Sequence, residues 1–181
     1  MSDFDDIIAQ CKAENPAAQE RLFRLYAPKM LGVCRRYMSS VDDARDAMQE
    51  GFVKVFLNIH KYEGRSSFNT WITRIMMNAS VDLLKKVNKV TFVRDDYFYK
   101  EEEKFAKDYF VEPGLNERQL LLVIDKLPNG YKLVFNMHVI DGLNHKEIAK
   151  ALNISEGTSK SQLARARAIL KTEIKKLQAA I

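Results

Sequence analysis

Residues 147–170, EIAKALNISEGTSKSQLARARAIL, contain two amphipathic segments separated by one short turn. Asn144 followed by Glu147 has the spacing of a capping box, so a helix is expected to begin there. The residues that this helix turns inward are Ile148, Ala149 and Leu152. The helix is expected to end at Asn153, because asparagine tolerates the left-handed backbone of a sharp turn. Ser155 is suited to cap a second helix. The stretch therefore predicts a helix-turn-helix.

The second of these helices has one narrow apolar side. At about 100° per residue, its buried stripe comprises Ser159, Leu163, Ala166, Leu170, Ile174 and Leu177. The opposite, outward arc comprises Lys160, Ser161, Ala164, Arg165 and Ala168, flanked by Thr158 and Gln162, with Arg167 and Lys171 toward the other edge. Small side chains let such a helix approach DNA closely, and Arg, Lys, Gln and Ser can reach base edges or phosphates. The arc predicts a helix that enters the major groove, and a solvated basic helix is the alternative.

The positive charge of the chain is concentrated in this segment. Residues 145–176 contain eight Lys or Arg and three Asp or Glu, a surplus equal to the formal net charge of +5 of the whole chain. Phosphate contacts supply most of the non-specific affinity for nucleic acid. The placement of the charge favours a face that binds a polyanion.

The rest of the chain is also expected to be helical. Apolar residues recur at spacings of three and four, and the eleven Gly and Pro residues act as helix boundaries. The boundaries are expected at Pro16, Pro28, Gly64, Pro113 with Gly114, Pro128 with Gly130, and Gly142. Residues 95–112 carry seven acids against three bases, together with aromatic side chains, and predict an acidic linker. The expected organisation is all-α: a domain at 1–88, a linker at 89–114 and a helix-turn-helix domain at 115–181.

Several classes of protein are disfavoured by the composition. Cys11 and Cys34, the only cysteines, both belong to helical apolar patterns and cannot form a disulfide framework or a zinc site. Acidic residues precede the first apolar run, unlike in a secretory signal, and no stretch approaches the roughly 18 apolar residues of a membrane span. The expected location is the cytoplasm.

The chain lacks the residue clusters that are typical of an enzyme. Its three histidines, His60, His138 and His145, are scattered, and no His, Cys and carboxylate residues have metal-ligand spacing. No Gly-rich phosphate loop follows a strand pattern. We expect no catalytic residue, no cofactor, no metal and no small-molecule substrate.

The first domain has aromatic side chains around a loop at Gly64. Unpaired bases stack on such side chains, and hydroxyls can line a pocket for a flipped base. Phe68 and Trp71 continue a regular stripe with Ile72, Ile75 and Ala79, so we expect both in the core. Loop residues 61–67 are better candidates for nucleic-acid contact, as are Asn78 and Asp82 on the following helix. A local cap or ion pair is the alternative for Asp82.

Residues 127–167 closely resemble the C-terminal DNA-binding domain of bacterial RNA polymerase sigma factors of the extracytoplasmic-function group. The matching positions are Leu127 and Pro128, Val134 and Phe135, Asp141 and Gly142, Glu147 to Ala149, Gly157 and Thr158, Lys160 and Ser161, Leu163, and Arg165 to Arg167. The stretch DARDAMQEGFVKVF at 43–56 resembles the polymerase-binding helix of the group. The stretch YEGRSSFNTWITRIMMNASVDLLKK at 62–86 resembles its promoter-melting segment.

The resemblance implies a sigma factor that binds RNA polymerase core enzyme and recognises two elements of promoter DNA. For the minus-35 element it implies Thr158, Lys160, Ser161, Gln162, Ala164, Arg165 and Arg167. For the minus-10 element it implies Lys61, Tyr62, Arg65, Ser66, Ser67, Asn78, Asp82, Lys85 and Lys86. For the polymerase it implies Asp43, Asp46, Gln49, Glu50 and Lys54, on a helix side that docks on a coiled-coil hairpin of the largest subunit. An ordinary solvated charged face is the alternative for this side. An anti-sigma factor is implied as a further partner.

Some positions depart from the group or leave alternatives open. Ser159 stands where the group usually has Val, so it leaves a packing deficit or its hydroxyl bonds back into its own helix. Some relatives carry a bulkier residue at the position of Ala164, so their promoter preference does not transfer to this chain. The alternative for Arg165 is an ion pair with a nearby acid such as Glu156 or Glu173. The alternative function is a stand-alone helix-turn-helix regulator, whose N-terminal half would form a ligand pocket or a dimer interface.

Overall fold

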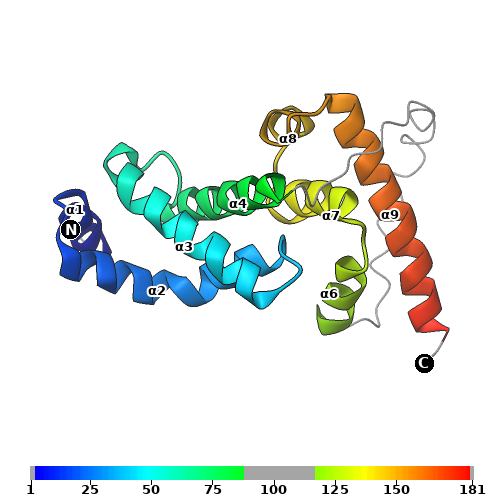
Figure 1. Cartoon of the computed structure of the whole chain (residues 1–181), viewed down its shortest axis with the longest axis horizontal. Coiled ribbons are helices and arrows are strands. Elements are labelled where there is room, and N and C mark those ends of the chain that lie inside the picture. The colour runs from blue at the N-terminus through cyan, green and yellow to red at the C-terminus, as the bar shows by residue number, and fades with distance from the viewer. Residues whose placement is uncertain (1–2, 88–116, 180–181) are drawn as a thin grey trace. The chain divides into compact units, whose positions relative to one another are not determined.

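The computed structural model describes residues 3–87 and 117–179, and every regular element within those two ranges is a helix (Figure 1). The all-helical class expected from the sequence is confirmed. The chain divides into two compact units, Met1–Val87 and Asn88–Ile181, which are described separately. The segment interpreted as an acidic linker, 89–114, lies outside the described residues.

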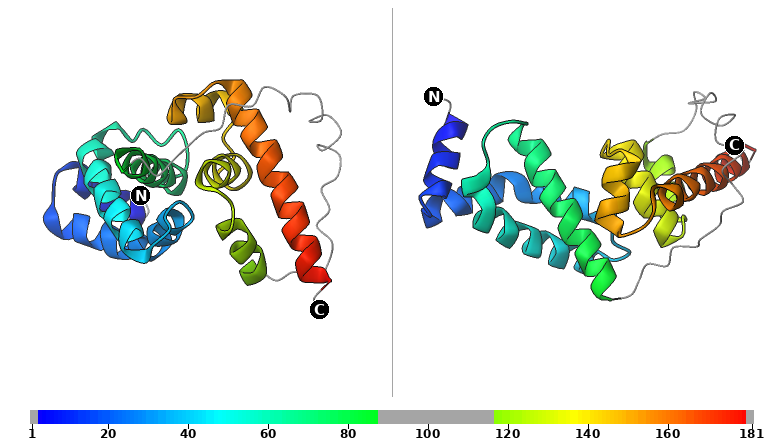
Figure 2. Two further views of the ribbon diagram at one scale, coloured as in Figure 1. Left: turned by 45° about the vertical axis from the view of Figure 1, so that its right-hand side comes forward. Right: turned by 90° about the horizontal axis from the view of Figure 1, so that it is seen from above.

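The described residues of the first unit, 3–87, form four α-helices. They are α1 (Asp3–Lys12), α2 (Pro16–Arg35), α3 (Val41–Asn58) and, after the 3₁₀ turn η1 (Ile59–Lys61), α4 (Phe68–Lys86). Side-chain oxygens of Asn15, Ser40 and Ser67 cap α2, α3 and α4 by accepting bonds from backbone N–H groups of the first turn. Helix α3 packs against both α2 and α4, as the views in Figure 2 show. The fully buried side chains of this core include Leu22, Met30, Val55, Ile72 and Met76.

Pro28 does not end a helix, contrary to the boundary expected there. Helix α2 continues through it to Arg35. An internal proline removes one backbone hydrogen bond and costs about 3 kcal/mol. Leu22 and Met30, on either side of it, have no exposed surface. Burial of apolar side chains on both sides of the proline offsets the lost bond, an effect that local sequence rules do not include.

The second unit is a smaller helical bundle. Its elements are α6 (Glu117–Asp125), α7 (Asn129–Phe135), a π-helical turn η3 (Asn136–Ile140), α8 (His145–Leu152) and α9 (Glu156–Gln178). Val123, Ile124 and Leu127 pack against Ala166 and Leu170 of α9 to form a core cluster. The long helix α9 is therefore held along its buried side by α6 and α7, and α8 packs near its beginning.

Replacement by alanine is expected to have opposite effects on stability at two helical glycines of the first unit. A Cβ at Gly51 of α3 would overlap Sδ of Met76, whereas a Cβ at Gly32 of α2 would meet nothing within 4 Å. Gly51→Ala is expected to destabilise the unit by about 1 kcal/mol net, because overpacking exceeds the gain in helix propensity. Gly32→Ala is expected to stabilise it by about 0.5–1 kcal/mol. Chemical denaturation of both variants measures these changes, and equal signs would contradict the packing argument.

Candidate nucleic-acid interface

The helix-turn-helix expected from residues 144–170 is confirmed. Asn144 Oδ1 accepts from the Glu147 N–H, and the Glu147 carboxylate accepts from the Asn144 N–H, both at 2.9 Å. Asn153 ends α8 in the left-handed conformation, with φ 56° and ψ 49°. Ser155 Oγ accepts from the Thr158 N–H at 2.9 Å and so caps α9. These local bonds fix the turn between α8 and α9 (Figure 1).

Helix α9 buries the apolar stripe that its sequence predicts. Leu163, Ala166 and Leu170 are buried, and Ile174 and Leu177 are partly buried against the same core. The partly exposed members of the expected outward arc are Lys160, Ala164, Arg165 and Arg167. These four side chains form the accessible part of the candidate minus-35 surface.

Three candidate residues of this surface are buried, which contradicts the expectation that they face outward. Thr158, Ser161 and Gln162 expose 9%, 4% and 1% of their surface. Thr158 Oγ1 lies 2.8 Å from Ser155 Oγ, and Ser161 Oγ donates to the Thr158 carbonyl at 3.1 Å, so both hydroxyls are bound within the helix. Gln162 is about 100° from Leu163 and belongs to the edge of the buried stripe. Contact of these three residues with DNA stays a prediction.

Arg165 has a tyrosine as its neighbour. Its Nη1 donates to the Tyr131 hydroxyl of α7 at 3.2 Å. Glu173 pairs with Lys126 and Lys176 instead, and an ion pair of Arg165 with another nearby acid stays untested. Hydrogen bonds from Lys176 and Lys126 engage Glu173 and hold its pKa below the usual value for a glutamate. Tyr131, which sequence reasoning missed, directs the guanidinium from outside α9.

Ser159 follows neither of the two alternatives considered for it. It has no exposed surface, and its Oγ lies 2.9 Å from Nδ1 of His145 at the start of α8. The hydroxyl is bound across the motif, to the other helix, and not back into α9. The two residues are 14 positions apart, and no helical periodicity pairs them.

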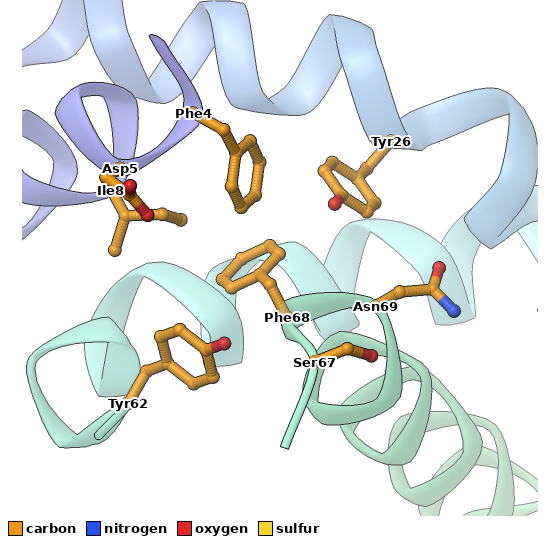
Figure 3. A pocket seen from close by; sticks show the side chains of 8 residues that line it. All are labelled: Phe4, Asp5, Ile8, Tyr26, Tyr62, Ser67, Phe68 and Asn69. Atoms are coloured by element: carbon orange, nitrogen blue, oxygen red, sulfur yellow. The ribbon is translucent and has the colours of Figure 1, made fainter. Parts of the chain in front are cut away.

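In the first unit, the loop before α4 borders an aromatic pocket of about 410 Å³ (Figure 3). The ring of Phe68 lies 5.5 Å from that of Phe4, 5.3 Å from Tyr26 and 5.2 Å from Tyr62, between centroids. The remaining lining residues are Asp5, Ile8, Ser67 and Asn69. Sequence reasoning identified Tyr62 and Ser67 as candidates and Phe68 as a core residue, and it missed Asn69. It also missed the residues of α1 and α2, because those helices contribute from more than 35 positions away.

The expected core positions in α4 are only partly buried as predicted. Phe68 exposes 4% of its surface, whereas Trp71 is half-buried and packs against Tyr62 and Phe68. The prediction is therefore confirmed for Phe68, which also forms a wall of the pocket, and Trp71 lies at the edge of the core. Ile72 and Ala79 are buried as expected.

The loop itself presents exposed polar groups. Lys61, Arg65, Ser66 and Ser67 are exposed, and Tyr62 is half-buried. The Tyr62 hydroxyl donates to the Ser66 carbonyl at 2.8 Å. Lys12 Nζ of α1 donates to the Tyr62 carbonyl at 2.7 Å. Arg65 pairs with Glu63 at 2.7 Å. These bonds hold the loop against α1 with its hydroxyls at the surface.

Helix α4 carries the remaining minus-10 candidates on its exposed side. Asn78, Asp82, Lys85 and Lys86 are all exposed. Asp82 forms an ion pair with Lys54 of α3 at 2.7 Å. Asp82 is therefore paired, but with another helix, and not locally as the alternative held. The pair brings together one minus-10 candidate and one polymerase candidate.

Helix α3 presents the polymerase candidates along one accessible side. Asp46, Gln49 and Glu50 are exposed, and Asp43 and Lys54 are partly exposed. Val53 and Leu57, which sequence reasoning did not select, expose 56% and 67% of their surface beside them. The side is thus acidic with exposed apolar side chains, a mixture suited to a protein partner.

The described ranges contain no group of three or more His, Cys, Asp or Glu side chains arranged to hold a metal ion. Among the helices of those ranges, none is long and apolar enough to cross a membrane.

Comparisons with known proteins match both units. Residues 22–90 match the model of sigma-70 region 2, and residues 117–170 match that of sigma-70 region 4. The ECF RNA polymerase sigma factor SigW of Bacillus subtilis is 27% identical over 180 residues, covering 94% of this chain and 96% of that protein. SigM of the same organism is 29% identical over 150 residues, covering 81% and 91%. The ECF sigma-E factor of Escherichia coli is 26% identical over 162 residues, covering 84% of each.

Two solved structures share the fold. The sigma factor RpoE in complex with the anti-sigma factor NepR from Bartonella quintana aligns with a TM-score of 0.54 at 17% identity, over 86% of this chain and 96% of that chain. CnrH in complex with the cytosolic domain of CnrY aligns with a TM-score of 0.50 at 22% identity, over 94% and 96%. Together, the two family models and the full-length relatives show that the chain belongs to the sigma-70 family, as a sigma factor of its extracytoplasmic-function group.

Proposed function

We propose that this chain binds bacterial RNA polymerase core enzyme and directs it to promoters by recognising a minus-10 and a minus-35 element. The observation that carries the proposal is the match of both units, in order, to the two sigma-70 regions. In this assignment residues 1–88 bind the polymerase and the minus-10 element, 89–114 connect the units, and 115–181 bind the minus-35 element. The protein acts in the cytoplasm, where its polymerase is.

The second unit supplies the minus-35 contact through α9. Lys160, Arg165 and Arg167 are cations on its partly exposed arc, with Ala164 as a small residue between them. A guanidinium can bond the guanine edge with two hydrogen bonds or clamp a phosphate, whereas an ammonium more often neutralises a phosphate. Arg165, directed by Tyr131, is the candidate for base recognition, and Lys160 is the candidate for phosphate contact.

The first unit supplies the minus-10 contact through the loop and the aromatic pocket. The aromatic walls of the pocket suit an unstacked base, and the volume of the pocket is sufficient for one base. Asn69 also lines the pocket, and a side-chain amide can form hydrogen bonds with the edge of a base. Lys61, Arg65, Lys85 and Lys86 would hold the backbone of the separated strand.

The exposed side of α3 supplies the polymerase contact. Asp43, Asp46, Gln49 and Glu50 offer acceptors on one helix side, with Val53 and Leu57 as apolar anchors. We assign Lys54 a second role, because its ion pair with Asp82 links α3 to the minus-10 side of α4. An anti-sigma factor is a further proposed partner. RpoE is solved in complex with the anti-sigma factor NepR, and CnrH is solved in complex with the cytosolic domain of CnrY.

Run-off transcription with core enzyme from the host of this chain tests the proposed function. The holoenzyme is expected to give specific transcripts from a genomic promoter library, and core enzyme alone to give none. The isolated chain is expected to bind duplex promoter weakly in the same buffer. Tight sequence-specific binding by the isolated chain, without any specific transcript, would instead establish the stand-alone regulator.

A further inference from the structure

A hydrogen bond between two helices connects the first turn of α8 to the buried side of α9. His145, the first residue of α8, places its Nδ1 2.9 Å from Oγ of Ser159. Ser159 is completely buried and His145 is partly buried. Ser159 lies four residues before Leu163, on the side of α9 that packs inward. It is also the neighbour in sequence of Lys160, a candidate for DNA contact. A polar contact therefore occupies a position that apolar packing would ordinarily fill.

A second histidine holds the first one in place. The rings of His138 and His145 are stacked, with centroids 4.5 Å apart and planes inclined by 15°. His138 Nδ1 lies 2.8 Å from the Leu143 carbonyl, so this nitrogen carries the proton and donates. His138 is thereby fixed in η3, before the helix-turn-helix, and its ring supports one face of His145.

We propose that His145 and Ser159 form a polar joint that sets the position of α9 relative to α8, and hence the reading position of α9 at the minus-35 element. The proposal rests on the proposed function, because it assigns α9 a base-reading role. His145 acts as a positioning residue and touches no base. A helix moves as a rigid body over one or two turns, so displacement at Ser159 is transmitted to Lys160 and Arg165. Losses of promoter contact follow from displacements of about 1 Å.

Burial and the neighbouring charges favour the neutral form of the His145 imidazole. Burial, His138, Lys160 and Arg167 together lower the pKa of His145 to about 4, and Glu156 opposes them. An imidazolium would lie among cations on the side of the motif that meets DNA. The pKa of His145 in the folded chain is below the ordinary value of about 6.5. The neutral imidazole therefore stabilises the folded chain fully above pH 6.5, and this contribution is lost as the pH falls toward 4.

A double-mutant cycle on the full chain tests the joint. His145→Phe keeps a ring against His138 and leaves the Ser159 hydroxyl without its partner. Ser159→Ala leaves His145 Nδ1 without its partner. The combination H145F/S159A removes both polar groups, and such paired apolar replacement is nearly neutral where single removal is costly.

The readout is open-complex formation by holoenzyme on two templates of one selected promoter, one complete and one with the minus-35 element replaced. Each single variant is expected to lose about tenfold in affinity for the complete template and to match wild type on the other. The double variant is expected to recover most of the loss. Thermal unfolding between pH 7 and pH 5 provides a second readout, in which the double variant should lose less stability than wild type.

The possible results separate the joint from the proposed function. Wild-type holoenzyme that forms no open complex on any promoter would overturn the proposed function. Three results would overturn the joint while the wild-type holoenzyme stays active. The single variants could bind the complete template as wild type does, or they could lose equal affinity on both templates. The losses of the two single variants could also add up in the double variant. A pH dependence of unfolding that is the same in wild type and H145F/S159A would overturn the preference for a neutral imidazole.

Discussion

A chain that carries both Asp46→Lys and Glu50→Lys is expected to lose about a hundredfold or more in affinity for polymerase core enzyme. Both side chains are exposed on α3, and among the described residues neither forms an ion pair that the change would break. We expect the polymerase surface that meets these two carboxylates to be basic, so two ammonium groups in their place would repel it. Co-purification with core enzyme measures the loss, and circular dichroism should show an unchanged helical content.

A matched control separates the position of the charges from their number. Glu14→Lys with Glu20→Lys changes the net charge of the same unit by the same amount, at exposed sites on the α1–α2 turn and on α2. The exposed pair of Glu20 with Arg24 contributes little, so this variant should fold and should bind core enzyme as wild type does. Equal losses for the two double variants would indicate a general charge effect and would contradict the assignment of the α3 side.

Local signals in the second unit were sufficient to predict its motif. The second unit has a capping box at Asn144, a left-handed turn at Asn153 and a cap at Ser155. Each of these features depends only on residues within four positions of it. The stripe through Leu163, Ala166 and Leu170 depends only on helical periodicity. Such features can be predicted from sequence because the interactions that create them are local.

Contacts between distant helices could not be predicted in the same way. The partners of Arg165, Ser159 and Asp82 are 34, 14 and 28 positions away, on other helices. No periodicity within one helix indicates which side chain of another helix will face it. The same limit explains the aromatic pocket, where Phe4 and Tyr26 meet Phe68, and the continuation of α2 through Pro28. The residue types on a face were predictable, whereas their cross-helix partners required the tertiary structure.

The burial of Ser161 and Gln162 refines the model of DNA recognition. Polar residues on an outward arc were interpreted as base contacts, yet the Ser161 hydroxyl donates to the carbonyl of Thr158 within α9. We therefore expect recognition to depend mainly on the cations that remain partly exposed. Among them, Arg165 differs from Lys160 because its guanidinium is already held by the Tyr131 hydroxyl. A side chain with a fixed direction loses less conformational entropy when it bonds a base.

Arg165→Ala is accordingly expected to cost about 1–3 kcal/mol of promoter affinity and to relax preference at one or two base pairs. Lys160→Ala should weaken all sequences evenly and reduce the slope of log affinity against log salt by about 1. Lys175→Ala, at the exposed far end of α9, removes the same charge and should leave both the preference and the affinity close to wild type. A base-by-base scan of the minus-35 element with each holoenzyme, at two salt concentrations, measures all three.

The scan distinguishes base reading from charge because the two mechanisms change different quantities. Loss of a guanidinium that bonds a guanine edge reduces discrimination at that base pair at any salt concentration, whereas loss of a phosphate contact shifts every sequence alike. Tyr131→Phe, which removes the hydroxyl and keeps the ring, should reproduce part of the relaxed preference if the hydroxyl directs Arg165. An unchanged base profile in Arg165→Ala would show that Arg165 does not read bases, and the specificity of α9 would then rest on Lys160, Ala164 and Arg167.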